Sequence, residues 1–174
     1  MSDTKCTRDI ACNSEGCLGN RGKITFDISI DPSSIERDRA NNDIPRLEAH
    51  RLWKICRGKL SVSFETQNER ILIETELIDY LLQVKEVIKE IENGVGEIVA
   101  VSRGDHFSNN INFRYEPESD TLEIYEVNAG EFDIKCCFAD FQREFAEFFG
   151  RAMIQILVCY PELQENQDFR MICV

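Results

Sequence analysis

The sequence contains no long hydrophobic run. No apolar stretch in its 174 residues approaches the roughly 18 consecutive residues of a membrane helix. The first ten residues also lack the basic start and the apolar stretch that together mark a secretory signal peptide. We therefore expect a soluble, unexported protein with a cytoplasmic location.

Basic residues are scarce, with 20 Lys and Arg against 32 Asp and Glu, which gives a net charge of −12. The acidity lies after residue 60, where 9 basic residues accompany 23 acidic ones. A protein that binds DNA or RNA without sequence preference needs a dense Lys/Arg surface to neutralise phosphates. Anionic membranes likewise attract basic segments. We expect neither nucleic acid nor membrane as a partner.

Histidine is nearly absent, with only His50 and His106 in the chain. Asp105, His106 and Ser108 contain the residue types of a hydrolase triad. Neighbouring side chains in a loop point apart, however, and triads are assembled from separate segments. No glycine-rich phosphate-binding loop is present either. We expect no enzymatic activity and no cofactor, and the alternative is an enzyme or small-ligand site around Arg103, Asp105 and His106.

The eight cysteines do not follow a metal-site pattern. An unexported protein keeps its thiols reduced, and a free thiol in an apolar stretch packs as a small hydrophobe. This interpretation covers Cys56, Cys136, Cys137 and Cys159. Zinc sites usually pair cysteines two to four residues apart and need four ligands. Near the start of the chain, five residues separate Cys6 from Cys12 and four separate Cys12 from Cys17. We therefore expect no metal site there. We expect either a loose tail or a tail with a single disulfide.

Hydrophobic periodicity predicts a polar, cysteine-containing tail over residues 1–22 and a single α+β domain over residues 23–174. Apolar alternation predicts strands over 23–30, 59–64, 69–74, 97–101, 111–116, 121–127 and 131–138. Helical spacing predicts helices over 45–57, 75–93 and 141–159. Residues 31–43 are predicted as a loop, with a short helical turn after Ser33 as an option. The resulting fold class is α+β, with an antiparallel sheet of a hairpin plus a meander packed by two amphipathic helices.

Phenylalanine is concentrated in one place, with five of the eleven between residues 138 and 149. Aromatic side chains at helical spacing belong far more often to a core than to a cofactor site. We expect this last helix to lie across the sheet.

The predicted meander is strongly acidic. Between residues 116 and 133 there are seven carboxylates and no Lys or Arg. Side chains alternate between the two faces of a strand, so Glu123 lies on the face that Leu122 and Ile124 do not share, and it should face solvent. Such a surface attracts and orients a basic partner, although an ordinary solvated surface is the alternative. The predicted contact residues are Glu116, Glu118, Asp120, Glu123, Glu126, Glu131 and Asp133.

Four runs of sequence resemble bacterial immunity proteins, the small cytoplasmic antitoxins of contact-dependent inhibition and other polymorphic toxin systems. They are residues 58–64 (GKLSVSF), 71–82 (ILIETELIDYLL), 111–125 (INFRYEPESDTLEIY) and 138–145 (FADFQREF). The similarity covers residues 22–163 and lies in element order and hydrophobic pattern.

The resemblance implies a protein that binds one cognate, basic toxin domain and blocks its active site or substrate entry, without chemistry of its own. The acidic meander is then the expected contact surface. An adaptor whose partner is not a toxin is a further alternative. The sequence indicates no oligomeric state.

Overall fold

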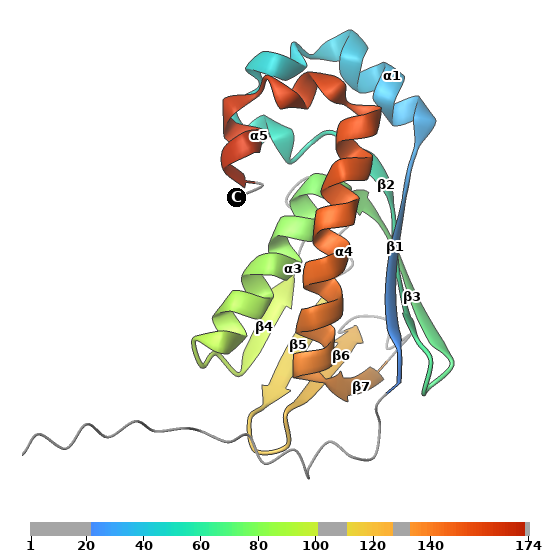
Figure 1. Ribbon diagram of the computed structural model, residues 1–174, viewed down its shortest axis with the longest axis vertical. Coiled ribbons are helices and arrows are strands. Elements are labelled where there is room, and N and C mark those ends of the chain that lie inside the picture. Colours follow the sequence, from blue (N-terminus) through green and yellow to red (C-terminus); the bar gives the residue numbers. More distant parts are fainter. Residues whose placement is uncertain (1–21, 101–110, 127–132, 173–174) are drawn as a thin grey trace, which may run out of the picture.

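The computed structural model describes residues 22–100, 111–126 and 133–172. Within these residues the chain forms two antiparallel sheets flanked by helices, which confirms the predicted α+β class (Figure 1). The buried side chains of both sheets and of the helices form one continuous cluster.

The first sheet contains three strands in the order β1 (Ile24–Ile30), β2 (Arg57–Phe64) and β3 (Glu69–Glu76). Their alternating sequences bury one face and expose the other, with Phe26 opposite Val62 and Val62 opposite Ile71. Asn68 in the β2–β3 turn has a φ of +52°, a left-handed conformation that asparagine tolerates. The predicted hairpin is confirmed.

The second sheet contains the predicted three-stranded meander over residues 111–137 and one further strand before it. Its strands follow chain order as β4 (Glu97–Ala100), β5 (Ile111–Glu116), β6 (Thr121–Glu126) and β7 (Asp133–Cys137). The helix α3 (Leu77–Glu92) connects the two sheets, and Asn93 caps its C-terminus, at the predicted end of this helix. The hairpin and the meander therefore form two sheets, whereas their sequences suggested one.

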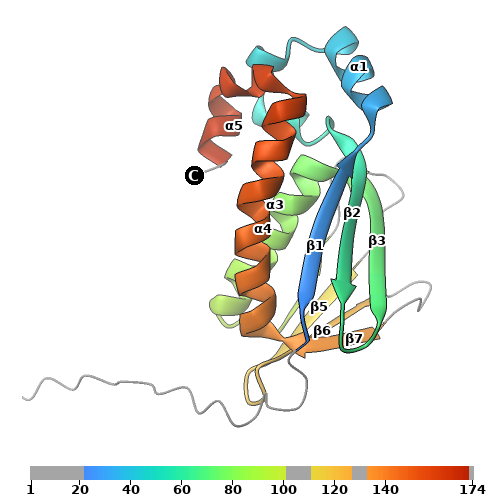
Figure 2. The same ribbon diagram turned by 45° about the vertical axis from the view of Figure 1, so that its right-hand side comes forward.

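The core lies where the inner faces of both sheets meet α3 and the long helix α4 (Phe138–Cys159). Helix α4 packs along β1 and runs from β7 toward the other end of the molecule (Figure 2). Phe26 of β1 has its ring centroid within 5.3–5.6 Å of the rings of Phe141, Phe145 and Phe148. The predicted phenylalanine stripe is thus the main contact of α4, which begins three residues earlier than expected.

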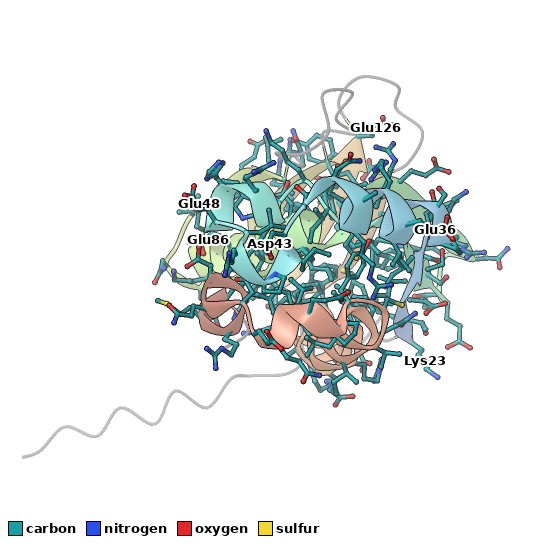
Figure 3. The ribbon with its side chains drawn as sticks, turned by 90° about the horizontal axis from the view of Figure 1, so that it is seen from above. Lys23, Glu36, Asp43, Glu48, Glu86 and Glu126 are labelled. Carbon is teal, nitrogen blue, oxygen red and sulfur yellow. The ribbon has the colours of Figure 1, made fainter. Side chains whose placement is uncertain are left out.

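The end of the molecule opposite the β5–β6 turn is a helical cap, defined here as the segments α1 (Pro32–Asn41), η1 (Ile44–Arg46), α2 (Ala49–Leu52), η2 (Pro161–Gln164) and α5 (Gln167–Ile172). Figure 3 views this cap from above. Early and late parts of the chain meet here, because Asn166 donates to the carbonyls of Ile44 (2.9 Å) and Leu47 (2.8 Å). Its own side-chain oxygen accepts from the backbone N–H of Phe169.

A buried polar cluster ties α1 to the end of α4. The Tyr160 hydroxyl donates to Asp38 Oδ2 at 2.9 Å, and the Cys56 N–H donates to the same oxygen at 2.9 Å. The Ser34 hydroxyl lies 3.3 Å from the Tyr160 hydroxyl. Arg37 pairs with the second oxygen of Asp38 at 3.0 Å. Every oxygen of this buried carboxylate therefore has a donor.

The cap contains the two wrong element predictions. Residues 31–43 hold a ten-residue helix, α1, which starts because Asp31 accepts the Ser33 N–H and Pro32 occupies the first turn. Its buried residues are the polar Ser34 and Asp38, so no apolar stripe revealed it. The predicted helix over 45–57 is instead two short segments, since Cys56 adopts a φ of +64° and Arg57 enters β2.

Candidate functional site

The candidate site is the outer face of the four-stranded sheet around the β5–β6 hairpin. Strand register places Glu123 between Arg114 on β5 and Lys135 on β7, with Tyr125 opposite Asp133 on the same face. Three of the predicted contact residues are exposed to solvent here, namely Glu116, Glu118 and Asp133. These three can meet a partner without rearrangement.

Glu123 lies on this face but is already paired. Its carboxylate contacts Arg114 Nη1 at 2.9 Å and Lys135 Nζ at 3.1 Å, and its side chain is only 16% exposed. The hydrogen bond from Lys135 to Glu123 raises the pKa of that lysine above its ordinary value. Glu123 therefore holds two cations in place on the surface rather than offering a free charge.

Arg114 extends this pairing across the sheet. Its guanidinium lies over the Tyr125 ring, 5.0 Å from the ring centroid, and donates to the Tyr125 hydroxyl at 3.1 Å. That hydroxyl donates in turn to Glu97. The outer face of the sheet thus carries an ordered row of charged and aromatic groups from β4 to β7.

Asp120 has a structural role in the β5–β6 turn. It has a φ of +49°, and its carboxylate accepts from the Tyr115 hydroxyl at 3.1 Å and from the Ala139 N–H at 3.4 Å. Its carbonyl accepts the Phe138 N–H at 3.0 Å. Asp120 therefore joins the turn to the start of α4 and is only partly exposed.

One predicted contact residue, Glu126, lies on the other face of the sheet. Glu126 pairs with Ile111 and shares the side of β6 that carries Ile124, facing away from Glu123. One of its oxygens is buried and has no hydrogen-bond partner among the described residues. Glu131 lies outside the described residues.

A hollow of about 680 Å³ opens beside the β5–β6 turn. Carboxylates and cations share its wall, which also includes apolar atoms. Its lining consists of Arg114, Tyr115, Glu116, Pro117, Glu118, Thr121, Glu123 and Lys135. The predicted contact surface did not include the two cations, because Arg114 and Lys135 lie just beyond the ends of the acidic run in the sequence. Antiparallel pairing places both of them beside Glu123. Cross-strand neighbours of each carboxylate were the signal that could have found them.

The alternative site around Arg103, Asp105 and His106 lies outside the described residues, as do Cys6, Cys12 and Cys17. His50 is exposed on α2, with its Nδ1 3.3 Å from Glu48. In the described part of the chain no three His, Cys, Asp or Glu side chains gather closely enough to hold a metal ion. None of the helices there has the length and apolarity needed to cross a membrane.

Comparisons with known proteins return no relative. No protein-family model matches the chain, and neither a curated protein nor a solved structure is significantly similar to it.

Proposed function

We propose that this protein is a cytoplasmic immunity protein that binds and neutralises a basic toxin domain through the outer face of the β5–β6 hairpin and β7. The observation that carries the proposal is the hollow of about 680 Å³ bordered by the exposed carboxylates Glu116 and Glu118. The sequence resemblance to immunity proteins supplies the class of partner.

Charge supports the choice of a basic partner. The chain has a net charge of −12, and long-range attraction of that sign raises the encounter rate with a cationic protein. Within the hollow, three carboxylates accompany two cations, so the wall stays acidic after Glu123 is paired. Incoming Lys or Arg side chains would pair with Glu116 and Glu118.

The fixed geometry of the face supports binding as well. Glu123, Arg114 and Tyr125 are already held by mutual contacts, so little side-chain freedom is lost when a partner docks. The cations Arg114 and Lys135 would then meet acidic or polar groups of the partner, which sets the orientation of docking. Binding of this kind blocks a toxin sterically and electrostatically.

The direct test is co-expression with the product of the adjacent gene, followed by growth rescue and co-purification. Growth rescue with a stable complex is the expected result. A protein that forms a complex without rescuing growth would be an adaptor, and a chain that gives neither result would refute immunity against that gene product.

Two triple charge-reversal variants test which surface binds the partner. Replacing Glu116, Glu118 and Asp133 with Lys should abolish the complex and change the free energy of unfolding by no more than about 1.5 kcal/mol, because each of the three exposed positions contributes about 0.5 kcal/mol or less. The matched control reverses Glu36, Asp43 and Glu48 on the helical cap, at the other end of the molecule (Figure 3). Both triple variants change the net charge equally, so loss of binding in both would point to general charge and not to this face.

A further inference from the structure

The two sheets protect their edge strands unequally. An edge strand presents unpaired backbone groups that can pair with another chain unless they are covered. On β1 the Ile28 carbonyl accepts from the Gln155 side chain of α4, and on β7 the Lys135 carbonyl accepts from Gln67 at 2.7 Å. Strand β4 has only four residues. Three of the four edges are thus covered or short.

Strand β3 is the exception. It runs for eight residues, and its pairing with β2 continues without a bulge from Glu69 to Glu76. It contains neither proline nor lysine, the residues that commonly block edge pairing. Among the described residues, residues 69–75 make no backbone hydrogen bond to any segment other than β2. Leu72 is 51% exposed on its outer face, although the outer faces of β1 and β2 carry only polar side chains.

The sequence of β3 is complementary to itself. We propose that β3 of one copy pairs antiparallel with β3 of a second copy, centred on Leu72, which joins two three-stranded sheets into one sheet of six strands. In this register Leu72 faces its own counterpart, and Arg70 lies opposite Glu74 in both halves of the dimer. Ile71 lies opposite Ile73 on the buried side. Apolar residues meet apolar residues, and opposite charges meet across the symmetry axis.

Other symmetric registers lack this complementarity. Centring the pair on Arg70 or on Glu74 sets two like charges directly opposite each other, which is unfavourable. Centring it on Ile71 or Ile73 sets Leu72 against a charged residue. Only the register centred on Leu72 pairs every outer-face residue from 70 to 74 with a suitable partner, so the proposal specifies a register as well as a strand.

The charged side chains of β3 do not cover its free edge. Arg70 donates to the Ser61 hydroxyl at 2.8 Å, and Glu74 pairs with Lys59 at 2.6 Å, so both side chains bond back toward β2. Both remain exposed at the outer face and can add a contact to a second copy. The edge lies on the sheet that does not carry the β5–β6 hairpin.

Sedimentation equilibrium under reducing conditions tests the pairing. The wild type should show a concentration-dependent dimer, and Leu72→Lys should raise the dimer dissociation constant at least about tenfold because it sets two cations at the axis. Arg70→Glu should raise it by about tenfold, since two opposed pairs become repulsive. The double variant R70E/E74R should return it to within about threefold of the wild type, because the charges are exchanged but remain complementary. Asp27→Lys, on the outer face of β1, is the control and should change nothing.

Three outcomes overturn the proposal: a monomer at every concentration, a dimer that Leu72→Lys does not weaken, and a double variant that stays as weak as Arg70→Glu. Circular dichroism and thermal unfolding of each variant show whether it has folded.

Disulfide cross-linking is a second, direct test of the register. Leu72→Cys should give an oxidised dimer whose linked peptides both contain position 72, whereas Thr25→Cys on β1 should not. Links from position 72 only to other cysteines would also overturn the register.

Discussion

Replacing Tyr160 with Phe tests the buried cluster that joins α1 to the end of α4. The change removes one hydroxyl, which donates to Asp38 Oδ2 at 2.9 Å, and keeps the buried ring. Asp38 retains its bonds from Cys56 and Arg37, and Ser34 retains the carbonyls of Asp31 and Arg57. The loss is therefore one hydrogen bond to a carboxylate, worth about 2 kcal/mol of unfolding free energy.

Urea denaturation measures this loss directly, and thermal unfolding should show a Tm lower by about 4–8 °C for a chain of this length. A double-mutant cycle with Asp38→Ala isolates the pair. In the Asp38→Ala background the Tyr160→Phe change should cost less than about 0.5 kcal/mol, because the acceptor has gone. Tyr125→Phe, which removes a hydroxyl from an exposed network, is the control and should cost less than about 1 kcal/mol. A cost for Tyr160→Phe below about 0.5 kcal/mol in the wild-type background would refute the reasoning.

Three further predictions concern the core, the turn and alkaline pH. Phe26→Ala removes contacts with three rings of α4 and should lower the unfolding free energy in urea by about 3–5 kcal/mol; a loss below 2 kcal/mol would contradict this packing. Asp120→Ala loses three acceptor contacts at a left-handed position and should lower the free energy of unfolding by about 2 kcal/mol, whereas the exposed Glu118→Ala should lower it by less than about 0.5 kcal/mol. Equal effects in thermal unfolding would contradict the structural role of Asp120. Burial raises the pKa of Cys56 and of Tyr80 above their ordinary values, so the unfolded chain loses these protons first. The contribution of these two groups to stability is therefore complete only below about pH 8, and above that it should fall by up to about 1.4 kcal/mol per pH unit for each group as its unfolded form ionises. Urea titrations at rising pH that show no decrease, or no relief in Tyr80→Phe, would contradict this.

The strands could be predicted from sequence because each buries one face. Alternation identified every strand within about two residues of its observed ends, as in β1, where Ile24, Phe26 and Ile28 are all buried. The same pattern does not specify which strands share a sheet, since residues far apart in sequence decide that. The hairpin and the meander were therefore assigned to one sheet and form two.

The helical cap was hard to predict because its buried groups are polar. Helix α1 buries Ser34 and Asp38, whose bonding partners Cys56 and Tyr160 come much later in the chain. In the candidate site, the sequence identified the acidic run but not the pairing of Glu123, which depends on strand register. Nor could composition show that Asp120 is held inside the turn by Tyr115.

The closure of the helical cap by Asn166 has a consequence for synthesis. Asn166 supplies the hydrogen bonds for the carbonyls of Ile44 and Leu47, which precede it by 122 and 119 residues. The ribosome synthesises Ile44 and Leu47 long before it reaches Asn166. Contacts between residues so distant in sequence form late in folding. A nascent chain therefore carries an open cap, with Ile44 and Leu47 uncovered, until its last described helix has emerged. Closure of the cap therefore waits until Asn166 has been made.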